Sequence, residues 1–403
     1  MKHRNGKAVL VLICLLTAVI FSGCRSKEKE PFGGWDYESE QTKTDENATP
    51  GGIVANATTL KDAFRRDFSV GCAVSLGDIQ DRNEWKFITS QFNSMTMGNE
   101  MKPESLLDQY ESEHSSDGMP VISTNRLNQI LEKAENANMK LRGHCLVWHS
   151  QTPEWFFYDH YDTMEKKADK ATMQKRMESY IKQVITYCQS THPGVIYAWD
   201  VVNEGIDDNG GFRQESNWWE AYGDESYIFD AFRFAKKYVD PDVSLFLNDY
   251  NEYAPDKTQD LVDLIQRLKK EDLIDGFGMQ SHWDMDYPSL DLLKDALKAY
   301  GSIPDLEVQL TEIDMHNTDN SPSGLQTQAD RYRSFFHAIL DAKRSGETNI
   351  TNVTFWGVND EETWLTNFRG EESFPLLFDK NNKKKPCFDA ILDEAKKEEE
   401  IND

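Results

Sequence analysis

The chain has 403 residues, 38% of them hydrophobic and 28% charged, which is long enough for a single barrel of about 250 residues or more. Acidic residues number 70 against 44 basic ones, and the resulting net charge of −26 repels nucleic acid and argues against DNA or RNA as partners. The six cysteines are spread out with no CxxC pair, which indicates neither a disulfide framework nor a zinc site.

Residues 1–24 have the pattern of an export signal. A basic start (2–7) precedes a short apolar run (8–21), and small residues stand directly before Cys24. This resembles a bacterial lipoprotein signal, whose cysteine is lipidated after cleavage, although Phe21 stands where Leu is usual. An ordinary secretory signal is the alternative. In both cases we expect an exported protein, and lipidation at Cys24 would make it a membrane lipoprotein facing the cell surface or the periplasm.

The remainder of the chain divides into three parts. Residues 25–55 are mostly Lys, Glu, Asp, Thr, Gly and Asn, so we predict a disordered tether. A single catalytic domain is expected over residues 56–397, beginning with a short helix at Thr59–Arg66. An acidic tail follows at residues 398–403.

Eight apolar or β-branched runs in the catalytic domain are predicted to be strands. They are Ser69–Val74, Asn93–Met97, Leu141–Val147, Tyr197–Val202, Ser244–Leu247, Gly276–Gln280, Leu306–Leu310 and Asn352–Trp356. The predicted helices are Arg126–Asn138, Met173–Gln189, Trp219–Tyr238, Lys257–Lys270, Leu290–Tyr300, Gln328–Lys343 and Phe388–Lys397. This alternation of strands and helices predicts an α/β fold of the (β/α)8 TIM barrel type. The segment Leu106–Ser123 has no clear period and is predicted to be a long loop.

Polar or aromatic side chains stand around the carboxyl ends of seven of the eight predicted strands. They are Asn99 and Lys102; His144, Trp148, His149 and Gln151; Asn203 and Glu204; Asn248, Asp249, Tyr250 and Asn251; Gln280 and His282; Glu312 and Asp314; Trp356 and Trp364. A single His or Trp at a strand end is more often a packing residue than a ligand. Because TIM barrels have their active sites at the carboxyl ends of the strands, the coincidence at seven ends predicts one shared site.

Two of these strand ends carry a glutamate that can serve catalysis. Glu204 closes the run beginning at Trp199, and Glu312 closes the run beginning at Leu306. Cleavage of a glycosidic bond needs one carboxylic acid to protonate the leaving oxygen and one carboxylate facing the anomeric carbon. Amides, imidazoles and lysine can hold sugar hydroxyls, while aromatic faces pack on the C–H surfaces of sugars. The chain has no GxxxxGK or HExxH motif, so we expect no cofactor and no metal.

Five segments carry a specific resemblance to a known family. They are Gly143–Gln151 (GHCLVWHSQ), Trp199–Glu204 (WDVVNE), Asn248–Asn251 (NDYN), Gly278–His282 (GMQSH) and Leu310–Asp314 (LTEID). Over roughly residues 56–397 the chain resembles glycoside hydrolase family 10, the family of retaining endo-β-1,4-xylanases, with the segments in the family's order.

The resemblance implies a function and the residues at its centre. It implies hydrolysis of internal β-1,4-xylosidic bonds of xylan by a retaining double displacement, with Glu204 as general acid/base and Glu312 as nucleophile. His282 would hydrogen-bond Glu312, with Asp314 supporting the imidazole. Asn203 would bind the 2-hydroxyl of the sugar beside the nucleophile.

The same resemblance implies a set of residues that bind substrate. Asn99, Lys102, His144, Trp148 and Gln151 would line the glycone side. Further residues would be Gln280 nearest the scissile bond, Trp356 and Trp364 over the glycone subsites, and Tyr250 toward the leaving group.

Two departures from the family pattern bear on glycone binding. Gly98 stands where the family usually has a glutamate that contacts the distal glycone sugar. The segment after Trp364 lacks the common Trp-Arg pair, and Arg369 is a candidate to compensate. For Glu100, a structural role and a binding role are both left open.

Three functional hypotheses follow, and the xylanase is favoured. A related barrel glycosidase could cut another β-glycan, such as mixed-linkage glucan or cellulose. A sugar-binding lipoprotein without catalysis is the third, but a binding protein needs neither an acid/base pair nor the supporting His282 and Asp314. The expected partners are xylan and xylo-oligosaccharides, together with a membrane reached through a lipid at Cys24, and we expect a monomer.

Overall fold

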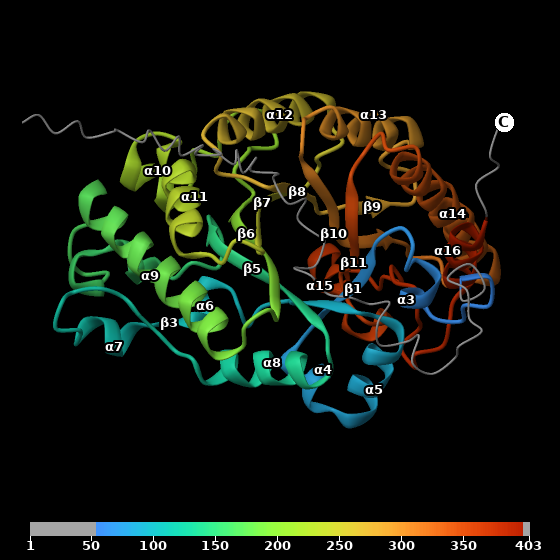
Figure 1. Cartoon of the computed structure of the whole chain (residues 1–403), viewed down its shortest axis with the longest axis horizontal. Helices are drawn as coiled ribbons and strands as arrows, with labels where there is room; N and C mark the ends of the chain where they lie inside the picture. Colours follow the sequence, from blue (N-terminus) through green and yellow to red (C-terminus); the bar gives the residue numbers. More distant parts are fainter. Residues whose placement is uncertain (1–53, 398–403) are drawn as a thin grey trace, which may run out of the picture.

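The computed structural model describes residues 54–397 (Figure 1). The predicted signal at 1–24, all but the end of the tether at 25–55, and the acidic tail at 398–403 lie outside the described residues. Between residues 54 and 397, no helix combines the length and the apolar character that crossing a membrane requires.

Eight parallel strands form the closed barrel that the sequence predicts. They are β1 (Ser69–Val74), β2 (Ser94–Met97), β5 (Lys140–Trp148), β6 (Ile196–Asn203), β7 (Ser244–Asp249), β8 (Gly276–Met279), β10 (Glu307–His316) and β11 (Ile350–Phe355). Each strand pairs with the next one along the chain, and β11 pairs with both β10 and β1. The TIM-barrel prediction is therefore confirmed, and each predicted strand overlaps an observed one. Their residues are almost all buried, as expected for strands covered on both faces.

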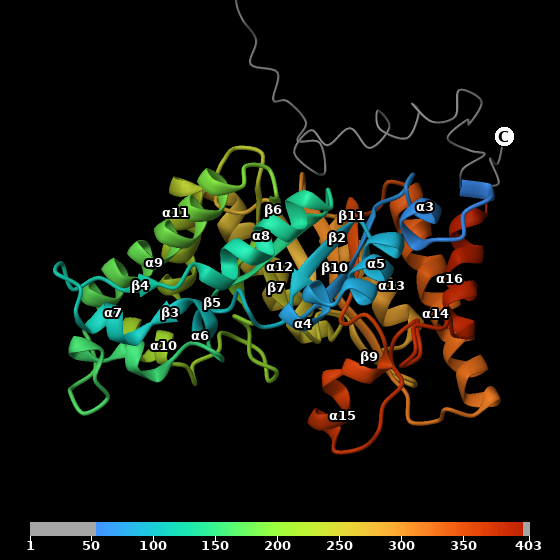
Figure 2. The ribbon, with the colours of Figure 1, turned by 90° about the horizontal axis from the view of Figure 1, so that it is seen from below.

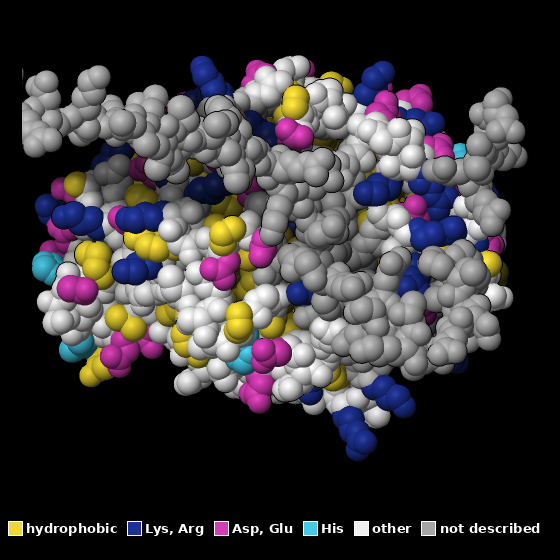
Figure 3. Space-filling view, viewed as in Figure 1, with side chains coloured by type: hydrophobic (Ala, Val, Ile, Leu, Met, Phe, Trp, Pro, Cys, Tyr) yellow, Lys and Arg dark blue, Asp and Glu magenta, His cyan; other side chains and the backbone are white. Residues whose placement is uncertain are grey.

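The helices form the outer layer of the barrel, as Figures 1 and 2 show. The long ones are α8 (Asn125–Asn136), α9 (Lys170–Thr191), α11 (Ser226–Tyr238), α12 (Pro255–Lys270), α13 (Leu290–Gly301), α14 (Pro322–Arg344) and α16 (Pro386–Lys396). The shorter ones are α3 (Leu60–Ala63), α4 (Leu76–Gln80), α5 (Arg82–Gln91), α6 (Pro103–Leu106), α7 (Gln109–Glu113), α10 (Asn217–Tyr222) and α15 (Trp364–Arg369). Three 3₁₀ turns occupy Glu154–Phe157, Asp159–Tyr161 and Asp360–Glu362. On the face shown in Figure 3, acidic and basic side chains are interspersed.

Three sequence-based predictions need correction. The helix predicted at Trp219–Tyr238 is two helices, because α10 ends at Gly223, whose φ of 78° is left-handed. The loop predicted at Leu106–Ser123 contains α7 and a short antiparallel ladder between β3 (Leu107–Asp108) and β4 (Val121–Ile122). Helices α4 and α5 were not predicted, although a capping box at Ser75 precedes the first of them.

The strand register brings the predicted site residues together. Trp148 on β5 lies beside Asn203 on β6, and Asn203 lies beside Asn248 on β7. A further short strand, β9 (His282–Asp284), pairs with the end of β10, so that His282 lies beside Asp314. Figure 2 shows β9 and α15 at the same end of the barrel.

A buried ion pair fills the barrel beneath the site. Arg142 and Asp200 are each 1% exposed and are paired, and Arg142 Nη1 donates a 2.7 Å hydrogen bond to Gln309 Oε1. The Arg142 guanidinium lies 4.4 Å from the centre of the Phe246 ring. His144 Nδ1 lies 2.9 Å from Asp200 Oδ2. Burial would raise the pKa of Asp200, but Arg142 and His144 outweigh it and hold the pKa below its ordinary value. The charged Asp200 therefore anchors His144 under the cleft.

Candidate active site

A cleft of about 810 Å³ lies at the carboxyl ends of the barrel strands. Every described residue with a predicted catalytic or binding role lines it. These residues are Asn99, Lys102, His144, Trp148, Gln151, Asn203, Glu204, Tyr250, Gln280, His282, Glu312, Asp314, Trp356 and Trp364. His149, Asn248 and Asp249, which also stand at predicted strand ends, are not among the lining residues. Cys24 lies outside the described residues.

Glu312 lies on β10 and is 5% exposed. His282 Nε2 lies 3.3 Å from its Oε2, and Asn248 Nδ2 donates a 2.8 Å hydrogen bond to its Oε1. The other imidazole nitrogen of His282 lies 2.9 Å from Asp314 Oδ1. His282 is therefore held between two carboxylates, which is the arrangement that the family resemblance implies.

The pKa values of this pair favour an imidazolium beside a carboxylate. Burial alone would lower the pKa of His282, but the charge and hydrogen bond of Asp314, together with Glu312, raise it to about 10. Burial would likewise raise the pKa of Glu312, yet the hydrogen bond from His282 and the neighbouring imidazoles hold it below its ordinary value. Glu312 is thus kept as an anion, which is the form that can attack a carbon atom.

Glu204 directly follows β6, and its side chain is 13% exposed. Trp148 Nε1 donates a 2.8 Å hydrogen bond to Oε2, while Asn203 Nδ2 and Gln280 Nε2 each donate one of 3.1 Å to Oε1. Burial raises the pKa of Glu204, and the nearby carboxylate of Asp249 raises it further, despite these hydrogen bonds. Glu204 therefore retains its proton to higher pH than an ordinary glutamate, which suits a general acid.

Amide side chains connect the two glutamates. Asn248 Nδ2 donates to Asn203 Oδ1 at 2.8 Å and to Glu312 Oε1 at 2.8 Å, and Asn203 in turn contacts Glu204. Thr311 Oγ1 donates a 2.6 Å hydrogen bond to Asn248 Oδ1, which fixes the orientation of this amide. Sequence reasoning gave Asn248 no role. Its signal was the same as that of Asn203, an amide at the end of a predicted strand.

A second polar group occupies the cleft near β2. Lys102 Nζ donates hydrogen bonds to Gln151 Oε1 at 2.8 Å and to Asn99 Oδ1 at 3.3 Å, and it lies 4.9 Å from the centre of the Trp148 ring. Burial lowers the pKa of Lys102, although the nearby carboxylates oppose this. These residues form one connected set, so that a sugar hydroxyl placed there would meet both donors and acceptors.

Aromatic side chains form the wall on the side of α15. Trp364 Nε1 donates a 2.8 Å hydrogen bond to Asp314 Oδ2. Asp314, which also contacts His282, is therefore held in place from a second side. Trp356 packs edge to face on His144, with ring centres 5.5 Å apart. Phe368, which the sequence analysis did not single out, is 67% exposed in the cleft and lies 4.7 Å from Trp364 between ring centres. This wall offers flat apolar faces to a ligand.

The structure also places Gly98 and Arg369, which bear on the departures from the family pattern, and Glu100, whose role was left open. Gly98 lines the cleft, and a Cβ atom built there would meet only Val74 O, at 3.7 Å. Arg369 lines the cleft and pairs with Asp284 on β9 at 3.2 Å. Glu100 accepts hydrogen bonds from two backbone N–H groups, those of Leu76 and Asn99, which supports the structural role for this residue.

The cleft thus combines one buried carboxyl group that favours its protonated form with one that favours its charged form. Among residues 54–397, no group of three or more His, Cys, Asp or Glu side chains is arranged to hold a metal ion. The cysteines of the described part, Cys72, Cys145, Cys188 and Cys387, are buried thiols. A TIM barrel with two carboxyl groups of opposite pKa perturbation at its strand ends is the arrangement expected of a glycoside hydrolase.

The chain belongs to glycosyl hydrolase family 10, whose sequence model matches residues 59–394. A similar protein is endo-1,4-β-xylanase B of Butyrivibrio fibrisolvens, 42% identical over 347 residues, which are 85% of this chain and 54% of that protein. The chain thus spans about half the length of that relative. A putative endo-1,4-β-xylanase of Caldicellulosiruptor saccharolyticus is 41% identical over 303 residues, which cover 72% of this chain and 96% of that protein.

Solved structures share the fold closely. The CBM22-1 and GH10 modules of a Clostridium thermocellum endo-1,4-β-D-xylanase, complexed with xylohexaose, superpose with a TM-score of 0.76 at 36% identity, covering 84% of this chain and 68% of that one. An intracellular xylanase of Thermoanaerobacterium saccharolyticum, in which a mutant is complexed with xylotetraose, gives a TM-score of 0.74 at 34% identity, covering 84% and 99%.

Proposed function

We propose that this protein is an endo-β-1,4-xylanase that hydrolyses internal bonds of xylan with retention of configuration. The observation that carries the proposal is the opposite perturbation of two carboxyl groups in one cleft, with the pKa of Glu204 raised and that of Glu312 lowered. The names of the similar proteins support xylan as the substrate. The uncharged donors and aromatic faces of the cleft suit a neutral polysaccharide.

The chemistry proceeds in two steps of the same type. Glu312 attacks the anomeric carbon while Glu204 gives its proton to the leaving oxygen, so that a covalent glycosyl-enzyme forms and the glycosidic bond breaks. Glu204, now an anion, takes a proton from water as the water oxygen attacks the same carbon and Glu312 leaves. Two inversions give net retention. The imidazolium of His282 stabilises Glu312 as a leaving carboxylate in the second step.

Comparison of substrates tests this proposal. Purified protein is incubated with xylan, mixed-linkage glucan and cellulose, and reducing sugar is measured, with the Glu312→Ala variant as control. Release from xylan alone supports the proposal. Preferential release from a glucan would identify a related β-glycanase, and binding without release would identify a sugar-binding protein. Chromatography of the products from glucuronoxylan and arabinoxylan would then show which decorations are accepted.

We also propose that the protein is exported, lipidated at Cys24 and monomeric. The basic, apolar and small-residue segments before Cys24 support lipidation, and a diacylglyceryl group carries the two chains that stable anchoring requires. A monomer would carry a complete cleft, because both glutamates and the residues that contact them belong to the same chain.

Labelling with radioactive fatty acid in the producing cell tests the anchor. Cys24→Ala should abolish the label, while Cys14→Ala, a cysteine change within the same leader, should leave it. A label that persists in Cys24→Ala contradicts the anchor. Sedimentation equilibrium of the released domain tests the monomer, and a mass of two or more chains would contradict it.

A further inference from the structure

Glu204 has an unusual backbone conformation that the surrounding structure must maintain. Its φ is 58°, in the left-handed region that a residue with a Cβ atom seldom adopts. The amide N–H of Glu204 donates a 2.8 Å hydrogen bond to Asn248 O. Its carbonyl accepts a 3.1 Å hydrogen bond from Arg213 Nε. Both backbone groups of this residue are therefore bonded to other segments of the chain.

The residues after Glu204 are held by the same surroundings. Arg213 N donates to Gly205 O at 3.0 Å, and Arg213 Nη2 donates to Ile206 O at 3.2 Å. The N–H of Ile206 donates a 3.2 Å hydrogen bond to the carboxylate of Asp249, atom Oδ2. We refer to residues 204–206 as the acid turn. Two side chains, those of Arg213 and Asp249, thus bond its backbone directly.

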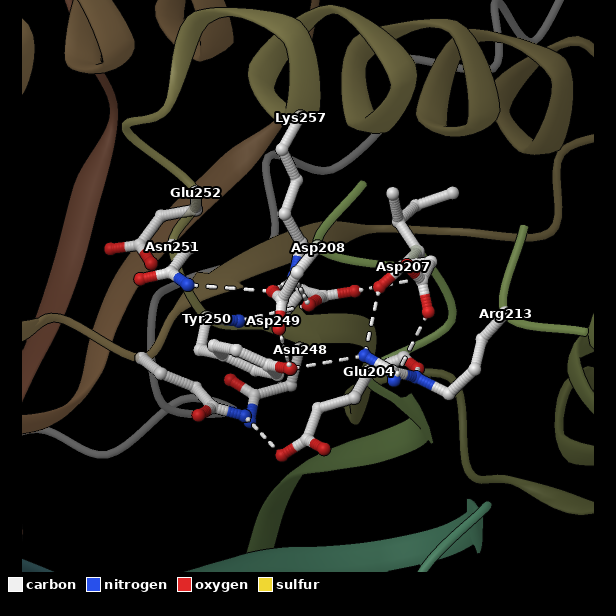
Figure 4. A network of polar contacts seen from close by, with 12 residues as sticks. Glu204, Asp207, Asp208, Arg213, Asn248, Asp249, Tyr250, Asn251, Glu252 and Lys257 are labelled. Carbon is white, nitrogen blue, oxygen red and sulfur yellow. Dashed lines mark hydrogen bonds and ion pairs between the residues drawn. The ribbon is translucent and has the colours of Figure 1, made fainter. Parts of the chain in front are cut away.

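Asp249 is an ionisable side chain with no exposed surface. Its Oδ1 forms a 2.9 Å ion pair with Lys257 Nζ and accepts a 2.9 Å hydrogen bond from Tyr250 N. Lys257 is 2% exposed and extends from α12, as Figure 4 shows. A buried ion pair of this kind is seldom a net gain in stability over an apolar pair, so its presence beside the acid turn calls for another explanation.

Lys257 and Arg213 are joined through Tyr250. Lys257 Nζ lies 3.8 Å from the centre of the Tyr250 ring, and Arg213 Nη2 donates a 3.1 Å hydrogen bond to the phenol oxygen. The same phenol donates a 2.8 Å hydrogen bond to Asp208, which also lies 3.3 Å from Lys257. Figure 4 shows these groups as one network behind Glu204.

We propose that Asp249 and Arg213 are positioning residues for the general acid: they hold the acid turn by hydrogen bonds to its backbone, with the buried carboxylate of Asp249 placed beside it. This inference rests on the proposed function, because it needs Glu204 to act as the acid. Neither residue lies among those to which sequence reasoning gave a role.

The charges that face Glu204 come from several elements. The carboxylates of Asp249 on β7 and Glu312 on β10 both favour the protonated form of Glu204. Of these two carboxylates, Asp249 raises the pKa of Glu204 more. Arg213 and Lys257 oppose them by their positive charge. His149, whose Nδ1 lies 3.8 Å from Glu204 Oε2, is neutral near pH 7, because burial and the two cations lower its pKa to about 4.

Asp249→Asn tests the charge, with kcat/KM for aryl β-xylobiosides as the readout. A dinitrophenol leaves without a proton, whereas an unsubstituted phenol needs one, so only the phenyl substrate depends on the acid. We expect kcat/KM to fall about tenfold to a hundredfold for the phenyl substrate, a part of the 10²–10⁴ that general acid catalysis supplies, and to change little for the dinitrophenyl substrate. Equal losses for both substrates would overturn the proposal.

The pH profile provides a second readout on the same variant. The acid must be protonated, so activity on the phenyl substrate declines as the pH rises through the pKa of Glu204. Asp249→Asn removes a negative charge and leaves Lys257 with Asp208 as its remaining acidic partner, and both changes favour the ionised form of Glu204. The alkaline limb should therefore move to lower pH. A limb that stays in place or moves to higher pH would contradict the charge role.

Arg213→Lys tests the geometry separately and keeps the proposal testable if Asp249→Asn does not fold. Lysine retains the positive charge but cannot bond Glu204 O and Ile206 O together. We expect the same selective loss on the phenyl substrate, with the alkaline limb unmoved. Unchanged kcat/KM for the phenyl substrate in this folded variant would contradict the geometric role.

Asp260→Asn is the matched control. Asp260 lies on the same helix as Lys257 and accepts a 2.7 Å hydrogen bond from Gly211 N, but it does not bond the acid turn. It should leave both substrates and the pH profile unchanged. If the wild type cleaves aryl cellobiosides and not xylobiosides, the proposed substrate is wrong, while the positioning role is still tested on the cellobiosides.

Discussion

The two glutamates of the cleft differ in what surrounds them. Glu312 on β10 faces the imidazolium of His282, while Glu204 after β6 faces the buried carboxylate of Asp249. The pKa of the same side chain is therefore lowered at one strand end and raised at the other. The difference teaches that the division of labour between two identical residues is decided by their neighbours, as is general for paired catalytic carboxyl groups.

Removing the carboxylate of Glu312 should have the largest effect on activity. Glu312→Ala deletes the atom that attacks the anomeric carbon, so the covalent route is lost for every leaving group. We expect kcat to fall by about 10⁴-fold or more, as removal of a nucleophile commonly does. Activity on xylan and on dinitrophenyl β-xylobioside measures this. A variant that still turns over the dinitrophenyl substrate would contradict the role of Glu312.

Glu204→Ala should separate the two steps of the double displacement, formation of the glycosyl-enzyme and its hydrolysis. A dinitrophenyl substrate needs no proton to leave, so the glycosyl-enzyme should form in a burst and then stall, because no base activates water. Hydrolysis of xylan should fall by about 10²–10⁴-fold. Added azide needs no base and should restore turnover, giving a β-glycosyl azide.

The configuration of the azide product, determined by NMR, is decisive. An α-glycosyl azide would mean that the reaction does not proceed through two inversions. Rescue by azide of Glu312→Ala, rather than of Glu204→Ala, with the same β product would mean that the two roles are reversed.

Removing the imidazolium of His282 should raise the pKa of Glu312 and so bring it closer to that of Glu204. Without its partner His282, the pKa of Glu312 rises, so in His282→Asn the acidic limb of kcat/KM should move to higher pH. The lost orientation should also lower kcat about tenfold to a hundredfold. A pH profile of the variant against the wild type measures both, and an acidic limb at unchanged or lower pH would contradict the assignment.

The same side chain predicts a pH dependence of stability. The folded-state pKa of His282 is raised from 6.5 to about 10, so its stabilising contribution is complete below pH 6.5 and is lost as the pH rises through about 10. Urea midpoints of the wild type and His282→Asn should therefore converge across that range. A constant difference between them would contradict the raised pKa.

The smallest effect is expected at Gly98, which lines the cleft. The site has room for a side chain, and the φ of Gly98 lies outside the left-handed region, so Gly98→Glu should fold. A recovered charge-assisted hydrogen bond to a distal sugar is worth about 1–2 kcal/mol, and KM should fall more for short xylo-oligosaccharides than for polymer. Gly98→Gln is the control for charge, and an unchanged KM in Gly98→Glu would show that glycone binding does not use this position.

The barrel and its two glutamates were predictable from the sequence because both depend on local pattern. Parallel strands buried on both faces read as short apolar runs, and each run could be recognised by itself. Since the carboxyl ends of all barrel strands meet on one face, a glutamate directly after β6 and one within β10 had to approach each other. Both positions line the cleft.

Other features were decided only by tertiary structure. Asn248 joins Asn203 to Glu312, and Trp148 donates its N–H to Glu204, contacts that depend on strand register and on rotamers. Asp249 bonds the backbone of Ile206, 43 positions earlier in the chain. No local pattern marks such a bond, because its energy depends on the burial and charge that the closed barrel creates. The sequence determined which residues reach the cleft, whereas the packing around them determined which glutamate has the raised pKa and which the lowered one.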